Sequence, residues 1–235
     1  MTPKLDTAST LERIFETYSR QFAVLLPTAL IIFLPVAALQ VAVGTNVGLL
    51  ILALLLTFVA TQWYSGVVVL AVRDLQDGKR DFSVGQLISA SLPFLGPLLG
   101  AGVLYGLGLV AGFILLLIPG LILLTIWAVI APVIVIEGSG IGGAFSRSQA
   151  LVKGNGWRVF GVLIVMGIIT FLAQQIFASI GRGIADEIGA GVGFLIAVTL
   201  TAPLSALTAA TLYYTLLGMS EGVPATPDPP LPDPP

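Results

Sequence analysis

The chain contains 235 residues, of which 57% are hydrophobic and only 9% are charged. A soluble domain is usually about 45–50% apolar and about 25% charged, so this composition predicts a membrane protein. Histidine and cysteine are both absent, which excludes histidine bases, thiolate nucleophiles, disulfides and zinc sites built from these ligands. The formal net charge of −2 provides no broad basic surface, so we expect no nucleic-acid partner.

Long runs without charged residues divide the chain into candidate spans. These runs cover residues 21–72, 82–136, 159–181 and 188–220. A spanning helix needs about 20 apolar residues, so the first two runs each hold two spans and the last two hold one each. Turn residues at Gly44–Gly48 and at Pro119-Gly120 divide the double runs. The predicted spans lie near residues 22–43, 48–72, 93–117, 120–137, 157–178 and 191–217.

The predicted fold class is all-α, a polytopic membrane helix bundle of three hairpins within residues 1–218, because backbone groups in lipid must be bonded inside each helix. An amphipathic stretch precedes each hairpin, near residues 9, 83 and 140. We expect these stretches to form interfacial helices on the cytoplasmic side. Whether the three units are an internal repeat stays open, since their spacing is uneven.

Helical periodicity supports these stretches. In the first, apolar side chains share one face of a helix, namely Leu11, Ile14, Phe15, Tyr18 and Phe22. In the third, Ile141, Phe145 and Val152 share a face that Ser148 interrupts. Capping boxes are predicted for the pair Ser9 and Glu12 and for the pair Ser83 and Gln86.

The basic residues predict the orientation. Nine of the ten precede the first span or lie in the loops after spans two and four, and they are Lys4, Arg13, Arg20, Arg73, Lys79, Arg80, Arg147, Lys153 and Arg158. The tenth, Arg182, lies in the loop after span five. The positive-inside rule therefore places both termini in the cytoplasm, and we expect a bacterial cytoplasmic (inner) membrane. Residues 219–235 are Pro-rich and acidic, and a disordered tail is predicted there.

Two candidate sites lie near the fourth loop. Glu137 ends the fourth span, where a carboxylate opposes the helix dipole, so we expect a structural pair with Arg147, with a solvated carboxylate at the interface as the alternative. Arg147, Lys153, Trp157 and Arg158 form a basic-aromatic cluster at the base of span five. Such a cluster is typical of interfacial anchoring, and a more specific interpretation is a site for anionic lipid phosphates. Membrane lipids are thus the expected partners, and a membrane or soluble protein partner stays open.

Small and polar residues mark spans three and six. Span three carries three G-x-x-x-G pairs that point in different directions, which predicts a helix contacted on several sides and central in the bundle. Span six carries a polar stripe of Thr201, Ser205 and Thr208. These hydroxyls are typical of helix packing, and a path for a solute is the alternative. No catalytic, cofactor or metal residues are predicted, and no charged residue lies deep in a span.

Several segments of the chain resemble a known family. They are Ile118-Pro119-Gly120, Ala131-Pro132, Glu137, Ala144–Ser148 and Leu151–Trp157. They are similar to the bacterial membrane-domain family named after glycerophosphoryl diester phosphodiesterases. The resemblance implies a polytopic inner-membrane module, and the catalytic domain of that family has no counterpart in this sequence. We therefore expect a non-enzymatic module that interacts with lipids or organises a partner, with a transporter or channel for a small or amphiphilic solute as the alternative.

Overall fold

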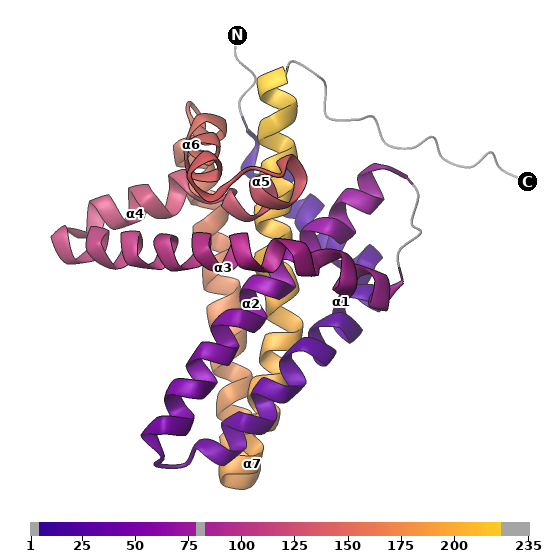
Figure 1. Cartoon of the computed structure of the whole chain (residues 1–235), viewed down its shortest axis with the longest axis vertical. Coiled ribbons are helices and arrows are strands. Elements are labelled where there is room, and N and C mark those ends of the chain that lie inside the picture. Colours follow the sequence, from indigo (N-terminus) through magenta and orange to yellow (C-terminus); the bar gives the residue numbers. More distant parts are fainter. Residues whose placement is uncertain (1–4, 79–82, 222–235) are drawn as a thin grey trace, which may run out of the picture.

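The computed structural model describes residues 5–78 and 83–221, so the predicted disordered tail lies outside the described residues from position 222 onward. The described chain contains helices and no strand (Figure 1). They are α1 Thr7–Val43, α2 Val47–Gln76, α3 Val84–Leu115, α4 Leu117–Ile126, α5 Ile130–Glu137, α6 Ile141–Val152 and α7 Gly156–Glu221. Six segments are long and apolar enough to cross a membrane, which confirms the predicted all-α class.

The last helix, α7, folds back on itself. A straight helix of its 66 residues would be about 100 Å long, and Gly181 and Gly193 would lie about 18 Å apart. Instead their backbones touch, because a Cβ built on Gly193 would lie 3.1 Å from the Gly181 Cα. α7 therefore consists of two antiparallel arms, Gly156–Ile184 and Ile188–Ser220, which correspond to the fifth and sixth predicted spans.

The helices run in two main directions. α1, α2 and both arms of α7 extend toward one end of the molecule, which holds the α1–α2 turn and the turn of α7 (Figure 1). α3 and α4 lie across this direction as a hairpin that projects to one side. The core lies where α1 and α2 meet α7, with Phe33, Tyr64 and Leu207 fully buried. A buried hydrogen bond supports this packing, in which the Tyr64 hydroxyl donates to the Leu25 carbonyl at 2.9 Å.

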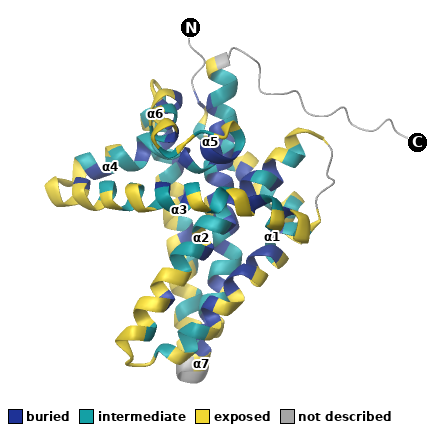
Figure 2. Ribbon diagram, in the orientation of Figure 1, coloured by how far each residue is buried: buried dark blue, intermediate teal, exposed yellow. Residues whose placement is uncertain are grey.

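The third predicted span is less central than its glycines suggest. Its middle is indeed approached closely, because a Cβ on Gly102 would overlap Gln62 Nε2, and one on Gly108 would overlap the Trp127 ring. Further along, α3 has left α2, and Leu107 and Ile114 are 63% and 78% exposed. The expectation of a central helix is therefore wrong for the last turns of α3, where Gly112 packs against Gly120 and Leu123 of α4 and the outer side chains are exposed (Figure 2).

The interfacial stretches take two forms. The first is continuous with its span in α1, and the second is continuous with its span in α3, whereas the third is the separate helix α6. The capping box of Ser83 and Gln86 is present. The box predicted for Ser9 is wrong: Asp6 caps α1, because its carboxylate accepts the amides of Ala8 and Ser9. These hydrogen bonds, chiefly the one from the Ser9 amide, lower the pKa of Asp6.

Candidate functional site

The fourth predicted span is broken at residues 127–129, between α4 and α5. Pro132 contributes to the break, because it has no N–H to donate to the Ala128 carbonyl four residues earlier. Ser148 of α6 satisfies the groups that the break frees: its hydroxyl donates to the Ile126 carbonyl at 2.8 Å and accepts the Val129 N–H at 3.3 Å. Ser148 is fully buried. The serine that interrupts the apolar face of α6 therefore holds the break in place.

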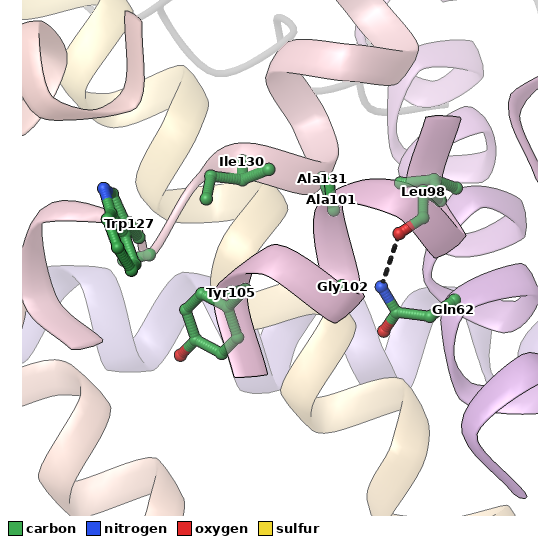
Figure 3. Close-up of a pocket in the computed structure, with 9 residues that line it drawn as sticks. Gln62, Leu98, Ala101, Gly102, Tyr105, Trp127, Ile130 and Ala131 are labelled. Atoms are coloured by element: carbon green, nitrogen blue, oxygen red, sulfur yellow. Dashed lines mark hydrogen bonds between the residues drawn. The ribbon is translucent and has the colours of Figure 1, made fainter. Parts of the chain in front are cut away.

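A cavity of about 150 Å³ lies beside this break. It is lined by Gln62, Leu98, Ala101, Gly102, Tyr105, Trp127, Ala128, Ile130 and Ala131 (Figure 3). The amide of Gln62 crosses from α2 and donates to the Leu98 carbonyl at 2.9 Å. The Gln62 amide can reach this position only because residue 102 is glycine, since a side chain at 102 would occupy the same space as the amide. Among the described residues no protein partner is recorded for Gln62 Oε1 or for the Tyr105 hydroxyl, so both are available to a small polar guest.

The chemistry of this cavity is limited to hydrogen bonding and apolar contact. Its lining holds no carboxylate and no basic side chain. A volume of 150 Å³ accommodates several water molecules or one small solute, since a water in the liquid takes about 30 Å³. Within the described part of the chain there is also no group of three or more acidic residues placed to hold a metal ion.

Glu137 and Arg147 lie together at the end of α5. Arg147 Nε is 3.0 Å from Glu137 Oε1 and 3.1 Å from Oε2. The buried Tyr213 of the second α7 arm donates its hydroxyl to the same Oε1 at 3.0 Å. The carboxylate thus joins α5, α6 and α7. The sequence carries no signal for Tyr213, which is one of two adjacent tyrosines in a largely apolar run. The stabilising role of the pair stays a prediction, in which Glu137→Gln lowers stability.

The basic-aromatic cluster does not form one site. Arg158 points into the protein, where its guanidinium donates to the Leu5 carbonyl at 2.8 Å. Asn155, which sequence reasoning overlooked, accepts the Leu5 N–H at 3.1 Å. Together they hold the buried Leu5 against the start of α7. Only Lys153 and Trp157 project outward, and Trp157 is 84% exposed.

A groove of about 480 Å³ runs beside Lys153. It is lined by Ile126, Ser146, Gln149, Ala150, Val152, Lys153, Gly154 and Gly156. The ammonium group of Lys153 therefore lies at the edge of a largely apolar groove. The groove is formed by the end of α4, by α6 and by the start of α7. Lys153 takes part in none of the ion pairs recorded between described residues. The groove combines a cationic group, an apolar floor and a neighbouring exposed tryptophan.

The predicted polar stripe lies only partly inside the bundle, because Ser205 is exposed. Thr201 and Thr208 are buried, and their hydroxyls donate to the carbonyls four residues earlier at 2.8 and 2.7 Å. Ser205 makes a long contact of the same kind, at 3.5 Å. Gln174 of the first α7 arm donates to the Thr201 hydroxyl at 3.2 Å, which links the two arms. The cavity and the groove described above are lined by other residues.

Comparison with known proteins gives one match. Residues 82–219 match a family described as a domain of unknown function, DUF7847, and this region runs from the start of α3 to the end of α7. No curated protein and no solved structure matches the chain. The likeness to the phosphodiesterase membrane domains therefore stays a resemblance. Because the matched region covers more than half of the sequence, the chain belongs to the DUF7847 family.

Proposed function

We propose that this protein is a non-enzymatic integral membrane module that binds an anionic phospholipid at the α6 groove. The observation that carries the proposal is the exposed Lys153 at the edge of an apolar groove of about 480 Å³. A phospholipid presents the matching chemistry, with a phosphate for the ammonium group and acyl chains for Ile126 and Ala150. Trp157 beside the groove is suited to the headgroup layer, where aromatic side chains with a polar edge are enriched.

The rest of the predicted cluster acts differently in this proposal. Arg147 is held by Glu137, and Arg158 is held by the Leu5 carbonyl, so both fix the protein around the groove. We place the groove and both termini on the cytoplasmic side of a bacterial inner membrane, because the basic residues gather there. A lipid held between α6 and α7 also provides a surface on which a protein partner can be organised.

Lipid retention tests this function. The purified full chain is mixed with phosphatidylglycerol or phosphatidylcholine and examined by native mass spectrometry. We expect retention of phosphatidylglycerol, and about fivefold weaker retention in Lys153→Gln, since a basic residue near an anionic surface contributes about 1 kcal/mol. Arg13→Gln is the matched control, because it removes an exposed positive charge outside the groove. Equal losses in both variants would indicate general charge attraction, and no loss in either would exclude the groove.

The helix break favours a second candidate, a path for a small polar solute. Broken helices beside a cavity are typical of transporter binding sites, where unpaired backbone groups meet the solute. Here Gln62, Tyr105 and the Ala128 carbonyl would supply the polar contacts. In Ala131→Cys, reaction of the thiol with a small water-soluble thiosulfonate in liposomes would favour this function. A thiol that reacts only after detergent is added would argue against it.

A further inference from the structure

We propose that the α3–α4 hairpin is re-entrant. It enters and leaves the bilayer on the side of the termini, and its tip at residues 114–118 lies among lipid acyl chains without reaching the opposite aqueous phase. The four remaining long segments, α1, α2 and the two arms of α7, then cross the bilayer. This inference is independent of the lipid groove proposed above.

The direction of the hairpin and the length of α4 carry the first step. α4 has 10 residues and is about 15 Å long, which is half of a hydrocarbon layer of about 30 Å. α5 does not extend it as one straight helix, because residues 127–129 interrupt the two. Both α3 and α4 lie across the direction of the four other segments (Figure 1). When those four segments cross the bilayer, the hairpin lies across the membrane normal and does not reach the opposite face.

The separation of α3 from α2 is the second step. The two helices are in contact where Gly102 faces Phe58 and Gln62. Beyond this point they diverge, and the side chains that an antiparallel pair would bury are open: Leu54 of α2 is 60% exposed, and Leu107 of α3 is 63% exposed. The hairpin therefore projects from the bundle with exposed outer sides (Figure 2), and the large exposed residues there are apolar.

The chemistry of the projecting part identifies what surrounds it. Residues 99–126 contain no charged residue, and their polar side chains are those of Tyr105 and Thr125. Thr125 is buried and donates to the Leu121 carbonyl at 2.7 Å. At the tip, Ile114, Leu116 and Ile118 are 78%, 69% and 68% exposed. An interfacial helix keeps one polar face toward water, whereas this hairpin is apolar on every exposed side, which matches acyl chains.

The start of α4 leaves fewer amide N–H groups without partners than an ordinary helix start does. A helix start normally has four unpaired N–H groups. At α4 the N–H of Leu116 donates back to the Gly112 carbonyl at 3.1 Å, and Pro119 has no N–H. The amides of Leu117 and Ile118 remain, which halves the usual cost of placing a helix start in lipid.

The chain ends agree with an even number of crossings. Asn155 contacts both ends of the described chain, since it accepts the Leu5 N–H and its own amide lies 3.9 Å from Met219 Sδ. Both ends are therefore on one side. Four crossing segments preserve this arrangement as well as six do.

Spin labelling tests the proposal. The natural chain has no cysteine, so Leu116→Cys, Ile118→Cys and Thr45→Cys each carry one thiol for a nitroxide. All three sites are exposed, so the label does not enter the core. In phosphatidylglycerol and phosphatidylcholine liposomes, we expect labels at 116 and 118 to collide readily with oxygen, which dissolves in acyl chains, and rarely with a water-soluble nickel complex. The label at 45 should show the reverse.

Each other outcome overturns the proposal. If the nickel complex reaches positions 116 and 118 as readily as position 45, the tip lies in water and the hairpin crosses the bilayer or lies outside it. If oxygen and nickel are both excluded at the tip, protein covers it, and a second copy of the chain rather than lipid is the partner. Two tip positions are used so that one misfolded variant cannot decide the result.

Discussion

The α1–α2 turn and the α3–α4 turn each connect two apolar helices, but the first turn is polar and the second is apolar. The first contains Gly44 at a φ of 43°, and Asn46, whose side chain accepts the Leu49 N–H at 3.1 Å. The second is Leu116, an extended residue with no side-chain cap. Asparagine suits a helix start in water, whereas leucine suits one in lipid. The difference indicates that the α1–α2 turn lies in water and that the α3–α4 turn lies in lipid.

The largest difference in stability is expected when a charged residue is introduced at each of the two turns. We expect Leu116→Asp to destabilise the inserted protein by about 2.5–3.5 kcal/mol, the scale for a charged residue deep in a membrane. Thr45→Asp should change little, because position 45 is exposed at a polar turn. Yield of folded protein in membranes and unfolding in mixed micelles measure both variants. Equal tolerance of the two would remove the distinction between the turns.

Alanine substitutions at two glycines of α3 test how closely this helix packs on α4. A Cβ on Gly112 would lie 3.0 Å from the Gly120 Cα, which is backbone and cannot move aside easily. Gly112→Ala should therefore cost about 1–3 kcal/mol. Gly106→Ala, where nothing lies within 4 Å of the new Cβ, should be neutral or stabilise by up to about 1 kcal/mol. Melting temperatures in the same detergent compare the two; the reverse order would contradict this packing.

The helix break between α4 and α5 lets the hairpin lie across the bundle, and Ser148 supports it. Ser148→Ala leaves the Ile126 carbonyl and the Val129 N–H without partners, so we expect a loss of about 1–3 kcal/mol. Ser146→Ala on the same helix is the control, since Ser146 is exposed and bonds only within its own helix. Thermal unfolding of the two variants checks this, and similar melting points would show that the break needs no support.

The smallest effect is expected at the cap of α2. Asn46→Ala removes the acceptor for the Leu49 N–H, and such a change at a helix start in water usually costs about 1 kcal/mol. Leu116→Asn introduces the same cap at the other turn, where an amide must enter lipid, so it should destabilise. Chemical unfolding of both variants measures the sign. A gain in stability from Leu116→Asn would place that turn in water.

The sequence predicts the helices more fully than their arrangement. Charge-free runs locate all six apolar segments, because the membrane requirement acts on each segment alone. The direction of α3 could not be predicted, since it depends on where Gly102 admits Gln62 and on how Ser148 stabilises a break. Arg147 was identified as a partner for Glu137 by proximity in sequence. Tyr213 and Asn155 were not identified, because their contacts join positions 76 and 150 residues apart.

The most direct test of the central claim is sided thiol labelling. Leu116→Cys, Thr45→Cys and Gln149→Cys are placed in membrane vesicles of known orientation and treated with a maleimide that cannot cross lipid. We predict that Thr45→Cys reacts from one side, Gln149→Cys reacts from the other, and Leu116→Cys reacts from neither until detergent is added. Reaction of Leu116→Cys from the same side as Thr45→Cys would show that the α3–α4 hairpin crosses the membrane and would contradict the account.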